Sequence, residues 1–238
     1  MGENAKKRRN FLYIVLASVT ALIQESHNND RAYLVRCSRN SLVSRWKSKM
    51  NKAIFLDRDG TINIEKDYMY KPEDFEFIPG VENAIERFMA LGFKIIIITN
   101  QSGIARGYYT EDDLMALHEF INKKIRMRLP NVGIDAFYYC PHHPQGAIEK
   151  YSVECNCRKP KKGLFEQAIY DFNINIKLSW AVGDRVRDIG PAVEIGMNGA
   201  LVLTGYSRYK DSSGRYIVVE NLNILADILT KNAYGKQS

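Results

Sequence analysis

Apolar and polar residues alternate in blocks along most of the chain. From Lys52 onward, short runs rich in Ile, Val and Phe alternate with longer stretches in which apolar residues recur every three or four positions. The short runs fit strands buried on both faces, and the longer stretches fit amphipathic helices. The predicted strands are Ala53–Leu56, Lys94–Thr99, Ala136–Tyr139, Ser179–Val182 and Ala200–Leu203. The predicted helices are Val81–Leu91, Glu111–Arg128, Gly163–Phe172, Val186–Gly196 and Leu222–Lys231.

Strand and helix follow each other five times in this pattern. Such an alternation is typical of a doubly wound α/β fold, in which right-handed connections place helices on both faces of a mainly parallel sheet. We therefore expect one Rossmann-like domain over residues 50–238. Ligands of such sheets bind at the carboxyl ends of the strands, so the residues that follow each strand are the candidates for a functional site.

Basic residues are concentrated before this domain. The chain has a formal net charge of +7, and residues 1–50 alone contain ten Lys and Arg against three Asp and Glu. The rest of the chain is therefore electrically balanced. A balanced domain lacks the positive face that binds nucleic-acid phosphates, so we expect no nucleic-acid partner.

The first 49 residues have two interpretations. The basic cluster Lys6–Arg9 and the apolar run Phe11–Ile23 have the layout of a secretory signal peptide, although the run is too short to span a bilayer. The alternative, which we favour, is a disordered extension or a misplaced start ahead of Met50. No run after Met50 approaches the length of a membrane span, so we expect no membrane partner for residues 50–238.

Charged and polar residues follow the predicted strands. Asp57 and Asp59 come after the first strand, Thr99 ends the second, Asp184 follows the fourth, and Lys159 lies on the loop after the third. Two residues apart on an extended backbone, the two aspartates lean to the same side, so one could attack a phosphate and the other could move protons. Asp57 and Asp184 could bind Mg²⁺, which must screen the negative charges. Thr99 and Lys159 could donate hydrogen bonds to the phosphoryl oxygens.

Three of the four cysteines lie in one loop. Cys140 is followed two residues later by His142, and Cys155 precedes Cys157 by the same spacing, which makes a nitrogen and sulfur ligand set suited to tetrahedral zinc. Four protein ligands leave no open position, so this zinc would be structural. Alternatives are a disulfide or buried thiols, and His143 competes as the imidazole. Thiolate ligands suit a reducing compartment, so we expect a cytoplasmic protein.

Four of these segments carry a family resemblance. The sequence is similar to the motifs of the haloacid dehalogenase superfamily of phosphatases at Phe55–Asn63, Thr99-Asn100, Lys159 and Gly183-Asp184. Within that superfamily, Thr99–Gly107 and Cys140–Gly146 resemble the D-glycero-D-manno-heptose 1,7-bisphosphate 7-phosphatases. The resemblance extends from Lys52 to about Leu203, and it implies a fold with a minimal cap.

The resemblance implies a role for each matching position. Asp57 would be the nucleophile and a Mg²⁺ ligand, and Asp59 the general acid and base, binding Mg²⁺ through its backbone carbonyl. Asp184 would complete the Mg²⁺ ligands, and His142 would be the zinc imidazole. The implied substrate-binding residues are Glu65, Lys66, Asp67, Tyr68, Thr99, Asn100, Gln101, Ser102, Arg158 and Lys159. The residues of the segment Glu65–Tyr68 differ from those usual at the matching positions in the family. Arg185 stands at a position that is often Lys.

The implied activity is Mg²⁺-dependent hydrolysis of the 7-phosphate of a heptose 1,7-bisphosphate through an aspartyl-phosphate, by a monomer. In the family, the heptose 1-phosphate product feeds lipopolysaccharide precursors. One alternative is a histidinol-phosphate phosphatase, which shares a zinc loop that is usually shorter than Pro144–Glu154. Another is a catalytically silent, zinc-stabilised binding module.

Three features have open interpretations. The segment Gly103–Gly107 could cradle an anion or cover the site. Asp188 could orient the metal ligands or be an ordinary acid in the first turn of a helix. We expect His118, inside a predicted helix, to be structural.

Overall fold

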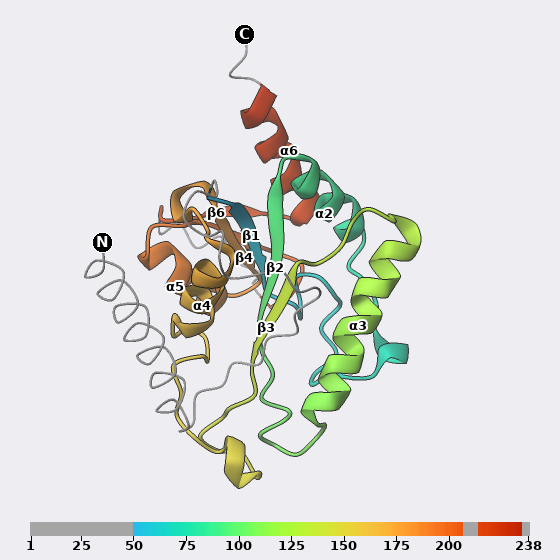
Figure 1. Cartoon of the computed structure of the whole chain (residues 1–238), viewed down its shortest axis with the longest axis vertical. Helices are drawn as coiled ribbons and strands as arrows, with labels where there is room; N and C mark the ends of the chain where they lie inside the picture. The colour runs from blue at the N-terminus through green and yellow to red at the C-terminus, as the bar shows by residue number, and fades with distance from the viewer. Residues whose placement is uncertain (1–49, 207–213, 235–238) are drawn as a thin grey trace, which may run out of the picture. The chain divides into compact units, whose positions relative to one another are not determined.

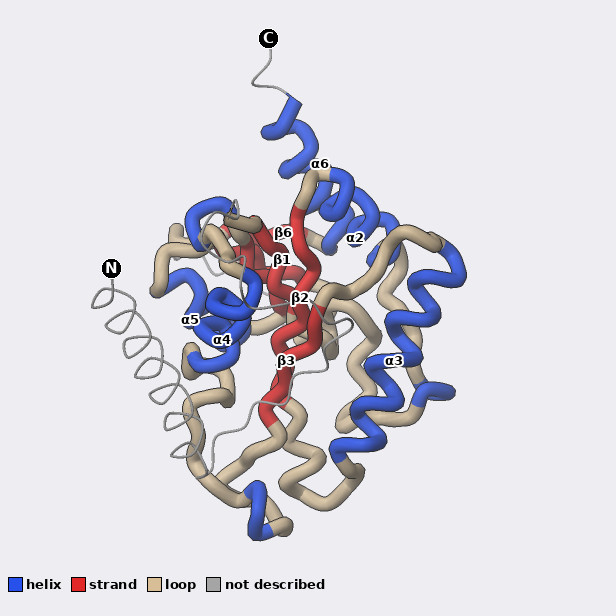
Figure 2. Tube along the Cα trace, in the orientation of Figure 1, coloured by secondary structure: helices blue, strands red, loops and turns tan. Residues whose placement is uncertain are grey.

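A parallel six-stranded sheet lies at the centre of the computed structural model, which describes residues 50–206 and 214–234 (Figure 1). The strands are β1 (Lys52–Leu56), β2 (Phe93–Asn100), β3 (Ala136–Cys140), β4 (Trp180–Gly183), β5 (Asn198–Val202) and β6 (Ile217–Val219). Their order in the sheet is β3-β2-β1-β4-β5-β6. Figure 2 shows the strands in red between the blue helices. The chain order turns outward in both directions from β1, so the carboxyl ends of β1, β2 and β4 lie together at the centre.

Helices cover both faces of this sheet. They are α2 (Val81–Ala90), α3 (Glu111–Arg128), α4 (Gly163–Phe172), α5 (Val186–Glu194) and α6 (Leu222–Tyr234), with short 3-10 helices η2 (Pro72–Asp74), η3 (Glu149–Tyr151) and η4 (Ile176–Leu178). Side chains of α2, α3 and α6 pack in one apolar cluster and those of α4 and α5 in another, on opposite sides of the sheet (Figure 1).

The two central strands are apolar on both faces. In β1, Ile54 and Leu56 join the cluster of α2, α3 and α6, whereas Ala53 and Phe55 join the cluster of α4 and α5. Successive residues of β2 divide between the same two clusters. The Phe55 ring lies 5.6 Å from that of Phe165 in α4. A strand buried on both sides requires the continuous apolar run that the sequence shows.

All five predicted strands and all five predicted helices are present, with ends that differ by three residues at most. The sequence analysis missed β6, which pairs with only three residues of β5 and is too short for a periodic signal. The predicted extension, residues 1–49, lies outside the described residues. Among the residues that are described, no helix is both long enough and apolar enough to cross a bilayer.

His118 occupies a buried position on α3. Its side chain is 1% exposed, and its ring stacks on Phe137 with 4.2 Å between centroids. Neither ring nitrogen has a hydrogen-bond partner. Burial, and to a smaller extent the charge of Arg58, holds the pKa of His118 well below its usual value of 6.5. The neutral ring therefore acts as a packing group, as the sequence predicts.

This burial predicts a pH dependence of stability. The fold keeps His118 neutral while the unfolded chain binds a proton near pH 6.5, so stability is full above that pH and falls below it. At pH 5.5 the loss is about 1.4 kcal/mol. We expect His118→Leu to remove this loss, as measured by the difference in unfolding free energy from wild type at pH 7.5 and at pH 5.5. Glu119→Leu, at an exposed neighbour, is the control, and a pH-independent difference for His118→Leu would contradict the prediction.

Candidate active site

A crevice of about 60 Å³ lies where β1, β2 and β4 end. Its walls contain carboxylates and cations from segments far apart in the sequence. The lining residues are Asp57, Asp59, Glu65, Thr99, Asn100, Lys159, Asp184, Arg185, Arg187 and Asp188. The structure thus brings the predicted phosphoryl-transfer residues together at the sheet edge where the fold predicts them.

Lys159 is the buried cation of this crevice. Its ammonium lies 2.7 Å from Asp57 Oδ1 and 2.8 Å from Asp188 Oδ1, and it donates to the Ile98 carbonyl at 2.8 Å. The side chain is only 1% exposed. Burial lowers the pKa of Lys159, but the charges of Asp188 and Asp57 together outweigh that effect and raise it. The amine therefore stays charged, with its donors held in fixed directions.

Three carboxylates face this single lysine. One oxygen from each of Asp57, Asp184 and Asp188 lies within 4.8 Å of the others. Burial raises the pKa of Asp57 to about 7, an effect that Lys159 opposes and Asp188 reinforces. Burial also raises the pKa of Asp184. The raised pKa values show that negative charge on these buried carboxyl groups is costly without a further cation, and carboxylate oxygens are the ligands that Mg²⁺ prefers.

Asp59 is oriented by three donors. Arg58, 1% exposed, places Nη2 at 2.8 Å from both carboxylate oxygens. Asn63 donates to Oδ1 at 3.0 Å, and Gln101 donates to Oδ2 at 3.1 Å. The Tyr109 hydroxyl in turn donates to Gln101 Oε1 at 2.6 Å. A carboxyl group held in this way can exchange a proton with a group in the crevice without first reorienting.

Two of the predicted substrate-binding side chains also hold the site together. The Asn100 amide accepts from the backbone N–H of Lys159 at 3.0 Å and donates to its carbonyl at 3.1 Å. Gln101 is buried and donates to the Thr99 hydroxyl at 2.8 Å. The end of β2 therefore fixes the backbone on which Lys159 stands.

The segment Glu65–Tyr68 divides between the crevice and the surface. Glu65 lines the crevice, and burial raises its pKa. Lys66 does not line it, because its ammonium binds the Asp74 carbonyl at 2.9 Å and Glu76 at 3.3 Å. Of the four substrate-binding residues predicted in this segment, Glu65 lines the crevice, whereas Lys66, Asp67 and Tyr68 do not.

Several lining residues were not assigned from the sequence. Asp188 was left open; it lies in the first turn of α5, and Asp184 lies just ahead of that helix, after the end of β4. The position of Asp188 against Lys159 favours a part in the site over that of an ordinary helix acid. The sequence does not predict that Arg187 lines the crevice, because its position depends on how α5 packs against the sheet.

Two arginines, Arg158 and Arg106, carry positive charge close to His143. Arg158, next to Lys159, donates to the His142 carbonyl at 3.2 Å. Burial lowers the pKa of His143, and the charges of Arg158 and Arg106 lower it further. Within the described part of the chain, neither arginine has an acidic partner within 4 Å. Their charges are available to an anion.

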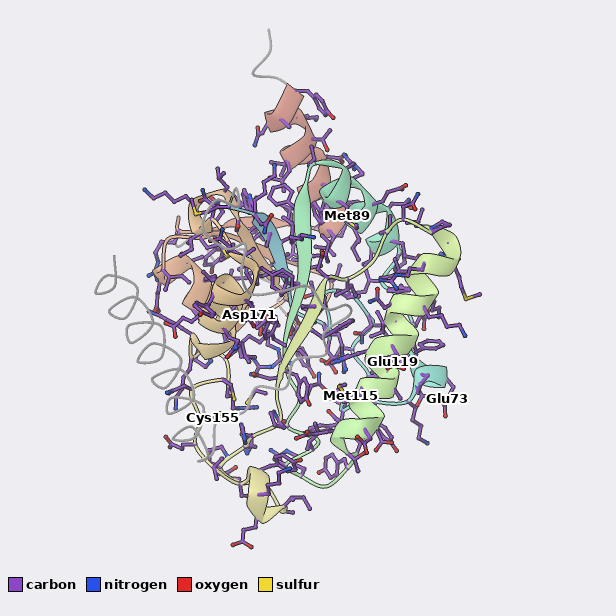
Figure 3. The ribbon with its side chains drawn as sticks, viewed as in Figure 1. Glu73, Met89, Met115, Glu119, Cys155 and Asp171 are labelled. Atoms are coloured by element: carbon purple, nitrogen blue, oxygen red, sulfur yellow. The ribbon has the colours of Figure 1, made fainter. Side chains whose placement is uncertain are left out.

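The predicted zinc ligands form one cluster on the loop between β3 and α4, where Cys155 is marked in Figure 3. The three sulfur atoms of Cys140, Cys155 and Cys157 lie 3.1 to 3.5 Å apart, and His142 Nδ1 lies 3.2 Å from Cys157 Sγ. A disulfide has sulfurs about 2.05 Å apart. Sulfurs bound to tetrahedral zinc at about 2.3 Å lie about 3.8 Å apart. The separations are thus too long for a disulfide and nearer to those of a zinc site, although somewhat shorter.

The zinc loop also rests on the segment Gly103–Gly107. The Ala105 carbonyl accepts from the backbone N–H groups of Ala147 and Ile148 at 2.7 and 2.9 Å. His143 lies outside the ligand cluster, and its Nδ1 accepts from the backbone N–H of Gln145. The structure therefore places His142, not His143, with the cysteines. These contacts pack the segment Gly103–Gly107 against the zinc loop.

Comparison with known proteins agrees with this arrangement. A family model described as HAD-hydrolase-like matches residues 156–225. The D-glycero-beta-D-manno-heptose-1,7-bisphosphate 7-phosphatase of Pasteurella multocida is 46% identical over 158 residues, which cover 66% of this chain and 84% of that protein. The chain belongs to this heptose-bisphosphate phosphatase family. The enzyme of the same name from Escherichia coli K12 is 43% identical over 146 residues, 61% of this chain and 75% of that one.

Solved structures of the heptose-bisphosphate phosphatase family share the fold. The D,D-heptose 1,7-bisphosphate phosphatase from B. bronchiseptica, complexed with magnesium and phosphate, is 30% identical with a TM-score of 0.67, covering 76% of this chain and 99% of that one. The corresponding Burkholderia thailandensis enzyme is 26% identical with a TM-score of 0.55, covering 76% and 100%. As members of the HAD family, the relatives are phosphoric monoester hydrolases, and this chain is an enzyme of that class.

The cysteine cluster generates a metal prediction. We expect Cys155→Ser to lower the zinc content of the purified protein and its melting temperature, because a hydroxyl replaces one of three thiolates. Elemental analysis and thermal unfolding would measure the two effects. Cys37→Ser is the matched control, since Cys37 is the cysteine outside the predicted ligand set. Unchanged zinc in Cys155→Ser would refute the assignment.

Proposed function

We propose that this chain hydrolyses the 7-phosphate of D-glycero-D-manno-heptose 1,7-bisphosphate and releases heptose 1-phosphate. The observation that carries the proposal is the buried Lys159 between Asp57 and Asp188, beside Asp184, in a chain that is 46% identical to an enzyme of that name. That arrangement is suited to phosphoryl transfer to a carboxylate.

In the first step, a carboxylate oxygen of Asp57 attacks the phosphorus, and the bond between phosphorus and the sugar oxygen breaks. Asp59 donates a proton to the departing sugar oxygen. Lys159 and Thr99 donate hydrogen bonds to the phosphoryl oxygens, whose charge is spread over them in the transition state. The product of this step is an aspartyl-phosphate on Asp57 and a free sugar hydroxyl.

In the second step, water attacks the phosphorus of the aspartyl-phosphate. Asp59, now ionised, accepts a proton from that water. The bond between phosphorus and Asp57 breaks, which restores both carboxyl groups and releases inorganic phosphate. The three donors on Asp59 keep it in place for both proton transfers.

The residues fit a magnesium cofactor. Asp57 and Asp184 would bind Mg²⁺ through carboxylates and Asp59 through its backbone carbonyl, and the ion supplies the positive charge that lets a negative phosphate approach a negative nucleophile. Asp188 would remain on Lys159 and keep that amine charged.

Arg158 contributes to recognition of the sugar portion of the substrate. Arg158 follows Cys157 and precedes Lys159, so it stands between the zinc cluster and the reacting phosphate. Without an acidic partner within 4 Å among the described residues, it can bind an anionic or hydroxyl-rich portion of the sugar. A structural zinc would hold this backbone in place. We further propose that the protein acts as a monomer in the cytoplasm, with thiolate ligands suited to a reducing compartment.

The function is tested by phosphate release with Mg²⁺ from both anomers of heptose 1,7-bisphosphate, from histidinol phosphate and from p-nitrophenyl phosphate. We expect kcat/KM to be highest for a heptose bisphosphate. The full chain and a fragment beginning at Met50 should act equally, because every proposed site residue follows Met50. Preference for histidinol phosphate would overturn the substrate, and no turnover of any of these compounds would favour a silent binding module.

The nucleophile is tested by Asp57→Asn. An amide cannot form the aspartyl-phosphate, so we expect kcat to fall by about three orders of magnitude or more. Thermal unfolding should show an intact fold. Asp112→Asn, which removes an exposed acid on α3, should keep the wild-type rate. A rate for Asp57→Asn close to that of wild type would exclude Asp57 as the nucleophile.

A further inference from the structure

The segment that follows β5 is fastened to the wall of the crevice. The Thr204 hydroxyl donates to the Gly60 carbonyl at 2.7 Å. The backbone N–H of Tyr206 donates to Asp184 Oδ2 at 2.8 Å. Between them, Gly205 packs so closely on Asp184 that a side chain would collide with its carboxylate. These contacts fix the point from which the Tyr206 side chain starts.

The guanidinium of Arg185 stacks on the face of the Tyr206 ring. The guanidinium carbon of Arg185 lies 3.4 Å from the ring centroid. Arg185 lines the crevice, and its nearest carboxylate contact is Asp184 Oδ2 at 4.0 Å from Nε, too long for a hydrogen bond. No hydrogen bond from the Arg185 side chain to another described residue is present. Its N–H groups therefore remain available to a ligand.

The other end of the Tyr206 side chain reaches the loop that contains Glu65 and Asp67. Its hydroxyl donates to Asp67 Oδ1 at 3.3 Å. Asp67 and Tyr68 both have left-handed backbone conformations, with φ of 40° and 53°. Residues other than glycine rarely adopt that backbone conformation unless their surroundings hold them there. Tyr206 thus contacts two residues that line the crevice, Asp184 and Arg185, and also Asp67, which is two residues from the lining residue Glu65.

An aromatic partner suits an arginine that must bind an anion. A carboxylate would hold the guanidinium equally well, but it would neutralise the charge and occupy the N–H groups that the ligand needs. An aromatic face restricts the guanidinium by stacking and leaves those N–H groups free in the plane. The face-on contact at 3.4 Å has this geometry.

We propose that Tyr206 is a positioning residue: it holds Arg185 at the crevice so that the guanidinium binds a second anionic group on the substrate, beyond the reacting phosphate. This inference rests on the proposed function, in which the second group is the 1-phosphate. Tyr206 acts through Arg185 and takes no part in the chemical steps.

The test measures binding in the full-length Asp57→Asn protein with Mg²⁺, in which neither ligand is turned over. Isothermal titration compares heptose 1,7-bisphosphate with heptose 7-phosphate, which lacks only the second anion. We expect the bisphosphate to bind more tightly, and Tyr206→Leu to reduce that preference about tenfold, the size of a lost charge-assisted hydrogen bond. Tyr206→Phe, which keeps the stacking face, should retain the preference.

Two further variants complete the design. Adding Tyr206→Leu to Arg185→Ala should reduce the preference no further than Arg185→Ala alone, since the tyrosine acts through the arginine. Tyr234→Leu makes the same replacement at an exposed tyrosine at the end of α6, and it should have no effect. In proteins with an intact Asp57, Tyr206→Leu should raise KM for the bisphosphate more than it lowers kcat.

The proposal is overturned if the Asp57→Asn parent does not prefer the bisphosphate, or if Tyr206→Leu keeps the preference. It is also overturned if Tyr206→Leu weakens both ligands equally, because that result would indicate a general distortion of the crevice. Failure of the proposed function gives a different result: wild type would release no phosphate from the heptose bisphosphate, while the binding preference and its dependence on Tyr206 would persist.

Discussion

The buried ammonium of Lys159 is the interaction on which the site depends. Removed from water and placed between Asp57 and Asp188, it keeps its proton only because both carboxylates are close. The same lysine limits the charge repulsion between the carboxylates that gather at the strand ends. Loss of the amine would leave three acids facing one another in a poorly solvated crevice, opposed only by the more distant Arg185 and Arg187 among the residues that line it.

The position of Lys159 is determined by contacts well outside the crevice. Asn100 at the end of β2 binds both backbone polar groups of Lys159, and Cys157 of the metal cluster lies two residues earlier. The loop that carries this cluster is fixed in turn by the Ala105 carbonyl. Lys159 lies on a loop, but these contacts hold its position as firmly as that of a residue on a strand. Phosphoryl transfer requires hydrogen-bond donors that are positioned in this way.

The sequence predicts best what depends on local pattern. Continuous apolar runs and the polar residues directly after them identified the central strands, and with them Asp57, Thr99 and Asp184. The spacing of the metal ligands identified the zinc cluster. Features that depend on tertiary packing were missed or left open. The strand β6 exists because β5 offers it a partner, Asp188 matters because α5 begins against Lys159, and Lys66 turns outward because Glu76 lies within its reach.

The continuity of chain between Cys157 and Lys159 has a thermodynamic consequence. Metal binding at one end and phosphate binding at the other both require the same short backbone segment in the same conformation. Two ligands that select one conformation must strengthen each other by equal factors. The factor by which phosphate in the crevice raises the zinc affinity of this loop therefore equals the factor by which bound zinc raises the phosphate affinity of the crevice.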